Sequence, residues 1–309
     1  MIQTYSATTE MFLSDLDVSK TRTSADLEQL SSGYKVRTAA DAPADIVTLL
    51  QVQNQMAQAT QVSSNLSRLQ TQVTSGEAAL DQAISLMQQA GVLGARGMAV
   101  DQTPVTFQAL ASQVQSLQQE MVGLSQTSAS GSYIFSGDND LQAQYTLDPT
   151  NTITGVKQAF PTQQTRQIAD ISGQTFTAGI TAQDIFDQTD SSGNPTANNV
   201  FAALQQLYNC LTANPPDTNA INQAVSNVNS ASTWLNNNLA FYGTVADRID
   251  SSMSIASRYQ TQWTQQIADI RTADIASVAS DLQAVKTQQS AALSAEANFQ
   301  PQSLFNYLR

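Results

Sequence analysis

The chain has 309 residues, of which 41% are hydrophobic and only 12% charged, with a formal net charge of −12 and a pI near 4.2. This negative balance argues against a nucleic-acid or anionic-membrane partner, because both are themselves negatively charged. Histidine is absent and Cys210 is the single cysteine, which excludes Ser-His-Asp and Cys-His mechanisms and the usual zinc ligand sets.

The remaining chemistry is sparse. No residue pattern favours Ser-Lys or carboxylate-pair catalysis, although composition leaves both open, and we expect no enzymatic activity and no cofactor. Cys210 lies in an apolar stretch and is interpreted as a core residue. Residues 1–4 have no basic n-region and no apolar h-region follows, so we expect no cleavable secretion signal. No apolar run approaches the roughly 20 residues of a membrane helix.

Residues 6–31 read as the first helix, because leucines recur at helical spacing. Lys20 and Thr23 interrupt this stripe, so the helix would be marginal alone in water. Gly33 is expected to end it. The four apolar positions of this seam are Leu13, Leu16, Leu27 and Leu30.

A loop and a second helix start follow. Ser32-Gly33 leads to Asp41, whose carboxylate is placed to cap the next helix, and Pro43 fits a first helical turn. Residues 45–90 then keep a seven-residue apolar frame over about 70 Å of helix. The glycines between residues 91 and 97 are expected to end or kink this helix; no strand precedes them, so a phosphate loop is disfavoured. A third helix begins at Pro104 and ends near residue 126.

Glycines bound a short aromatic stretch, Gly131 to Gly137, which predicts a hairpin strand. Tyr133 and Phe135 should point to one side of it and pack on neighbouring helices. Residues 138–140 faintly resemble a calcium loop, but no bidentate glutamate follows, so a plain turn is preferred. Short apolar pieces between turn residues then predict a small β-rich insert to about residue 196, including residues 145–147, 166–171 and 185–186.

Helices return at residues 200–211 and 219–239. Gly243 marks a possible break, and an apolar stripe continues into the C-terminal stretch. There the chain repeats a thin seam, interrupted by Gln289, and breaks at residues 298–301. A seam this narrow suits a partner helix, either the first helix or one from another copy. We expect both ends to be mobile in the isolated chain and ordered on assembly. The seam residues are Ile275, Val278, Leu282 and Val285.

The loop with Ser32, Gly33, Asp41 and Pro43, together with residues 273–276 and 295–298, resembles the two terminal signatures of the flagellin family. The pattern Gly131-x-Tyr133-Ile-Phe135-x-Gly137 is similar to the flagellin-like hook-associated branch of that family. The ending at residues 303–308 is similar to the same branch. The turn expected early in the insert is poorly matched at residues 145–148.

The expected fold is therefore mainly α: an elongated bundle of long antiparallel helices with coiled-coil termini and a small β-rich insert. We expect an N-terminal coiled-coil arm (1–40), a helical rod with the hairpin strand (41–137), an outer insert (138–199), a returning rod (200–271) and a C-terminal coiled-coil arm (272–309).

The resemblance implies an extracellular structural subunit of the bacterial flagellum, exported without a cleaved signal. It would form a ring with copies of itself, between an adjoining hook-associated protein and the flagellin filament, after binding a cytoplasmic export chaperone. A filament flagellin, a coiled-coil secretion-apparatus tip protein and an enzyme using serine or carboxylate chemistry are the alternatives.

Overall fold

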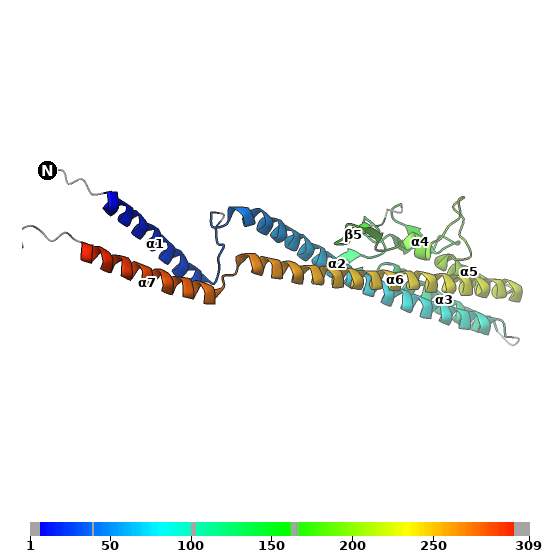
Figure 1. Ribbon diagram of the computed structural model, residues 1–309. Coiled ribbons are helices and arrows are strands. Elements are labelled where there is room, and N and C mark those ends of the chain that lie inside the picture. The colour runs from blue at the N-terminus through cyan, green and yellow to red at the C-terminus, as the bar shows by residue number, and fades with distance from the viewer. Residues whose placement is uncertain (1–6, 39, 100–102, 162–164, 166, 300–309) are drawn as a thin grey trace, which may run out of the picture. The chain divides into compact units, whose positions relative to one another are not determined.

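The computed structural model describes residues 7–38, 40–99, 103–161, 165 and 167–299. The predicted ending at residues 303–308 lies outside them. The described chain divides into two compact units, one of residues 1–58 and 259–309 and one of residues 59–258, and two long helices contribute to both. The helices are α1 (Ala7–Ser32), α2 (Pro43–Gly97), α3 (Pro104–Ser125), α4 (Ala182–Phe186), α5 (Val200–Thr212), α6 (Thr218–Arg271) and α7 (Ile275–Phe299) (Figure 1).

Among the described residues the strands form three separate antiparallel pairs, which confirms a mainly helical fold with little β-structure. Strand β1 (Ser128–Ala129) pairs with β2 (Ser132–Tyr133), β3 (Tyr145–Leu147) with β4 (Val156–Gln158), and β5 (Gln167–Ala169) with β6 (Thr175–Thr177). In the described part of the chain, no helix combines the length and the apolarity needed to cross a membrane.

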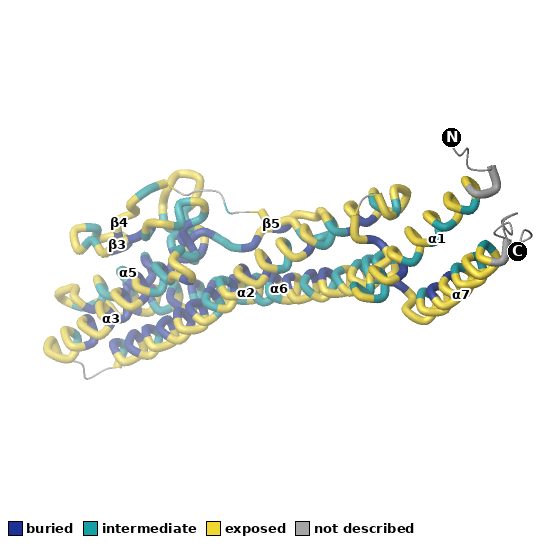
Figure 2. The backbone as a smooth tube through the Cα atoms, turned by 90° about the vertical axis from the view of Figure 1, so that its left-hand side faces the viewer, coloured by how far each residue is buried: buried dark blue, intermediate teal, exposed yellow. Residues whose placement is uncertain are grey.

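The unit of residues 59–258 is built around α2, α3, α5 and α6, whose buried sides face one another (Figure 2). The apolar frame predicted for the second helix supplies this core. The apolar residues of this frame that belong to the unit are completely or almost completely buried. The apolar residues that face them from α3, α5 and α6 are buried to the same extent. The largest of these aliphatic side chains are Leu66, Leu80, Met87, Met121, Leu204, Leu207 and Leu235.

The glycines predicted to end or kink the second helix do end it, since α2 continues through Gly91 and stops at Gly97, the last of them. Glycines of α2 also permit close helix contacts. A Cβ added at Gly97 would lie 2.7 Å from Leu211 of α5, and one added at Gly76 would lie 2.8 Å from the ring of Tyr242 of α6. Glycine is tolerated in the helix because a larger residue would not fit.

The predicted break at Gly243 is wrong, since α6 runs without interruption from Thr218 to Arg271. A single glycine lowers helix propensity by only about 1 kcal/mol, which packing on both sides of it can override. The real interruption comes at residues 272–274, where α6 ends and α7 begins.

In the described part of the insert, the buried aromatic side chains join the helical core and form no separate core. Phe186 of α4 stacks on Phe201 of α5 with ring centroids 5.8 Å apart, and Tyr145 of β3 lies 5.3 Å from Phe201. Asn199, the residue that caps α5, donates a 2.8 Å hydrogen bond to Asp187, and burial raises the pKa of that carboxyl. Residues 185–186, predicted as part of a β-rich segment, lie in α4.

The predicted strand between Gly131 and Gly137 is shorter than expected. Only Ser132 and Tyr133 are extended, and the turn before them places Ser130 and Gly131 at φ 54° and 82°, as a two-residue type I′ turn requires. Phe135 lies beyond the strand and is completely buried, 5.7 Å from Phe186 between ring centroids. The expectation that Tyr133 and Phe135 share one face is therefore wrong, because the chain turns between them.

Replacing Gly76 by alanine should destabilise the helical core, whereas the same change at Gly123 of α3 should not. A Cβ at Gly76 meets the completely buried ring of Tyr242, while one at Gly123 meets nothing within 4 Å. We expect Gly123→Ala to raise the free energy of unfolding by roughly 0.5–1 kcal/mol, because alanine favours a helix more than glycine does. The free energy of unfolding of Gly76→Ala should be about 1–3 kcal/mol lower than that of Gly123→Ala, because of the contact with Tyr242. Urea unfolding of both variants measures the difference; equal stabilities would contradict the close contact.

Candidate assembly interface

Helices α1 and α7 lie side by side and form the paired end of their unit (Figure 1). On each helix the least exposed positions recur every three and four residues, which is the spacing of a coiled-coil seam. Leu282 and Val285 of α7 are buried, at 9% and 6% exposure. The seam of α1 consists of Phe12, Leu16, Ser19, Thr23, Asp26 and Leu30, and that of α7 of Val278, Leu282, Val285, Gln289, Ala292 and Glu296.

The predicted seam residues fall into two groups. Leu16 and Leu30 of α1 and Val278, Leu282 and Val285 of α7 line this helix pair. The other three are exposed to solvent in the single chain, with exposed fractions of 51%, 49% and 45% for Leu13, Leu27 and Ile275. Sequence reasoning missed Phe12, Ser19 and Asp26, because leucine spacing alone placed the seam about 50° around α1 from where it lies.

Both helices of the pair expose large apolar side chains. Besides Leu13 and Leu27, α1 exposes Met11 and Val18, and α7 exposes Ile275 and Leu293. On α1, Met11 and Val18 lie on the opposite side of the helix from Leu27, so these residues do not form one stripe. We call the six residues the exposed apolar residues of the pair.

The two chain segments that lead into the pair cross in a short antiparallel bridge between Tyr34 and Thr272. The amide of Lys35 donates to the carbonyl of Arg271 at 2.7 Å, and the amide of Ala273 donates to the carbonyl of Gly33 at 2.9 Å. The guanidinium of Arg271 lies 4.7 Å from the centre of the Tyr34 ring. Together these contacts tie the end of α1 to the start of α7.

Gly33 makes this crossing possible. Its φ of 75° and the 2.8 Å hydrogen bond from its amide to the carbonyl of Gln29 end α1 in a left-handed turn that other residues rarely adopt. The hydroxyl of Ser32 donates to the carbonyl of Glu28 at 2.8 Å and accepts from the amide of Tyr34 at 3.3 Å. The first signature thus shapes the loop on which the helix pair depends.

The sequence predicted that Asp41 caps α2, but its carboxylate instead closes the loop before that helix. Its carboxylate accepts hydrogen bonds from the amides of Thr38 and Arg37 at 2.7 and 2.9 Å. These hydrogen bonds hold the pKa of Asp41 below its usual value, and the bond from the amide of Thr38 has the largest effect. Pro43 is the first residue of α2, as predicted. The carboxylate that caps a helix here is Asp274, which accepts from the amide of Ala276 at 3.0 Å.

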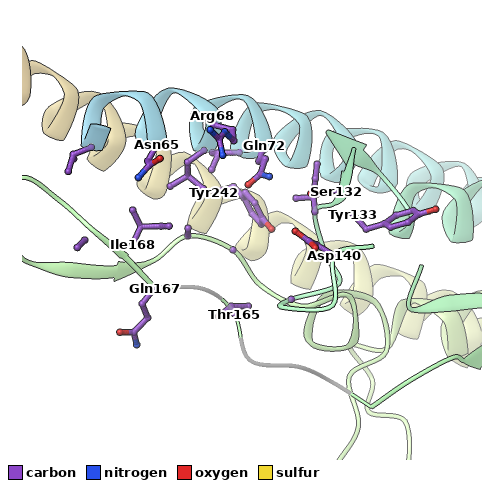
Figure 3. A pocket seen from close by; sticks show the side chains of 18 residues that line it. Asn65, Arg68, Gln72, Ser132, Tyr133, Asp140, Thr165, Gln167, Ile168 and Tyr242 are labelled. Atoms are coloured by element: carbon purple, nitrogen blue, oxygen red, sulfur yellow. The ribbon is translucent and has the colours of Figure 1, made fainter. Parts of the chain in front are cut away.

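A cavity of about 430 Å³ lies in the other unit, between α2, α6 and the hairpin of β1 and β2 (Figure 3). Tyr133 and Gly137 of the predicted motif line it, together with Arg68 and Gln72 of α2. Its lining residues include a single carboxylate, Asp140, and within the described chain no three His, Cys, Asp or Glu side chains are grouped to hold a metal. The motif therefore shapes the contact of the hairpin with α2. Its Phe135 is buried against the rings of Phe186 and Tyr242.

The paired terminal helices, joined through crossing linkers to long helices with a small strand-rich insert, define a flagellin-like fold. The profile of the bacterial flagellin N-terminal helical region matches residues 2–140, and that of the bacterial flagellin C-terminal helical region matches residues 221–308. The chain belongs to the flagellin family.

Solved structures with the same fold carry names from one branch of the flagellar proteins. A putative flagellar hook-associated protein of Vibrio parahaemolyticus aligns over 75% of this chain and all of its own, with a TM-score of 0.64 and 16% identity. The hook-associated protein-3 of Legionella pneumophila aligns over 71% and 98%, with a TM-score of 0.60 and 11% identity. Xanthomonas campestris FlgL aligns over 69% and 98%, with a TM-score of 0.58 and 16% identity. Among proteins with curated descriptions, none matches the chain significantly.

Removing the Asp41 carboxylate should loosen the crossing loop without unfolding the helices. We expect Asp41→Asn to speed hydrogen exchange of the amides of Arg37 and Thr38 by roughly 5- to 10-fold, because both lose a charge-assisted acceptor. Since the folded pKa is lowered, the wild-type stabilisation is present above the unfolded pKa near 3.9 and is lost as the pH falls through the lower folded value. Asp45→Asn, in the first turn of α2, is the control; equal effects would contradict the assignment.

A charge in the α1–α7 seam should separate the two helices. Leu282→Asp places a carboxylate at a buried position, whereas Ile275→Asp places one at an exposed position of the same helix. We expect limited proteolysis to trim both ends of the wild-type chain before residues 59–258. Leu282→Asp should speed trimming about tenfold, and Ile275→Asp should leave it unchanged. Full protection of both ends in a verified wild-type monomer, or the same trimming rate in both variants, would contradict the thin seam.

Proposed function

We propose that this chain is a structural subunit of the bacterial flagellum that forms a ring joining a hook-associated protein to the flagellin filament. The observation that carries the proposal is that the helix pair leaves six large apolar side chains exposed while its own seam is too thin to be stable alone. Burying these side chains of every copy against its neighbours would supply the missing stabilisation.

The choice of branch within the family rests on two further features. Two of the solved structures with a similar fold bear hook-associated names, and the Gly131–Gly137 motif supplies one strand of a hairpin and places Phe135 in the helical core. A filament flagellin is the alternative within the family, and a coiled-coil secretion-apparatus tip protein is the alternative outside it.

The proposal implies several partners and a location. Copies of the chain would contact one another through Leu13, Leu27 and Ile275, while hook-associated protein and flagellin would bind the opposite faces of the ring. A cytoplasmic chaperone would cover the C-terminal helix before export through the flagellar channel to the cell exterior. The role is mechanical, and we propose no catalytic function and no cofactor.

Cell-surface imaging of a deletion strain tests the proposed role. Loss of the chain should leave hooks without filaments and release flagellin into the medium, because filament subunits would lack their attachment ring. Expression of the wild-type chain should restore filaments. A strain without filaments that releases no flagellin would instead identify a filament flagellin, and normal filaments would refute a flagellar role.

A further inference from the structure

One carboxyl of the insert lies where the insert joins the helical core. Asp187 caps the end of α4 and is partly buried, and its carboxyl accepts a 2.8 Å hydrogen bond from the side-chain amide of Asn199. Asn199 is completely buried and caps α5, because its side-chain oxygen accepts a 2.8 Å hydrogen bond from the backbone amide of Ala202. The side chains of Asp187 and Asn199 thus connect the end of α4 to the start of α5.

A tyrosine of β3 lies close to the same carboxyl. Tyr145 is 1% exposed, and its hydroxyl is buried without a hydrogen bond of ordinary length to any described residue. Burial raises the pKa of this phenol, and the charge of Asp187 is the next largest cause. We call Asp187, Asn199 and Tyr145 the junction cluster. Its carboxyl faces an amide and a hydroxyl, and both of these are neutral.

No cation compensates the charge of this carboxyl among the described residues. Helices α4 and α5 contain no lysine or arginine. Lys157 of β4 is exposed, and its charge acts on Asp148. The charge of Arg248 of α6 acts on Asp170. The fold therefore removes Asp187 partly from water without a positive charge beside it, and burial raises the pKa of this carboxyl.

The other ionisable side chains on the elements around the junction cluster do not supply the missing positive charge. Asp184 of α4 is exposed, and its charge also raises the pKa of Tyr145. Asp190 is exposed and accepts hydrogen bonds from backbone amides of its own turn. On α5, Tyr208 and Cys210 lie more than about two turns beyond the start of the helix.

We propose that Asp187 is a pH-sensitive switch, which holds α4 against the start of α5 when its carboxyl is protonated and loosens this attachment when the carboxyl ionises. A neutral carboxyl still accepts the hydrogen bond from Asn199, whereas a carboxylate without a cation loses its water and is not compensated. Because the folded pKa is raised, the stabilisation is fully present below the unfolded pKa of about 3.9 and is lost as the pH rises through the higher folded value. The attachment of the insert should therefore weaken as the surroundings become less acidic. This inference does not depend on the ring assembly proposed above.

Hydrogen exchange of the full-length chain, followed by mass spectrometry and corrected for the intrinsic effect of pH, tests the switch. From about pH 4 to about pH 8, the protection of residues 182–203 relative to α2 should fall roughly 5-fold or more in the wild type. Asp187→Asn should keep its protection over this range, because the amide is neutral and its oxygen can still accept from Asn199. Asp184→Asn, at an exposed position of the same helix, is the matched control and should behave like the wild type.

Tyr145→Phe gives an independent check. The hydroxyl of Tyr145 favours the charged form of Asp187, so its removal should move the fall in protection to a higher pH. A midpoint that is unchanged or lower would overturn the proposal, as would the same pH dependence in Asp187→Asn and the wild type. An insert that exchanges rapidly at every pH in Asp187→Asn would show that the attachment requires the carboxylate itself, which also refutes the switch.

Discussion

The structure depends on a balance at the seam between α1 and α7, where apolar contacts are few and polar side chains many. Leu282 and Val285 are its only buried aliphatic residues within the described part of the two helices. An isolated pair of helices with so little buried area barely recovers the entropy of ordering its backbone. The crossing at Tyr34 and Thr272 compensates in part, because holding two chain segments next to each other lowers the entropy cost of pairing the helices that they lead into.

The core of residues 59–258 follows the opposite principle. Its helices approach so closely at Gly76 and Gly97 that a methyl group would collide with the opposing side chain. The rings of Phe135, Phe186 and Tyr242 then connect hairpin, insert and long helix in a chain of edge contacts 5.7 and 6.1 Å between centroids. The core of residues 59–258 is thus closely packed, whereas the pair of α1 and α7 buries only two aliphatic side chains within the described residues.

Periodicity and turn residues were sufficient to predict the helices, since the apolar frame of α2, the start at Pro43 and the end at Gly33 all follow from local rules. Glycines inside helices were harder to interpret, because one residue type serves two purposes. At Gly33 the positive φ is needed, and at Gly76 the missing side chain is needed; only the second requires knowledge of what packs against it. Asp41 misled for a similar reason, because its carboxylate reaches backward to Thr38 rather than forward to α2.

The seam shows most clearly why the site was only partly predictable. Leucine spacing identified the stripe that would make the best coiled coil, with Leu13 and Leu27 inside, whereas the single chain buries Asp26 and leaves those leucines outside. The pair that the single chain forms is therefore not the one that leucine spacing alone would select, because the spacing cannot say which of two overlapping stripes α7 covers. Only the packing of α1 against Leu282 and Val285 shows which side of the helix is buried.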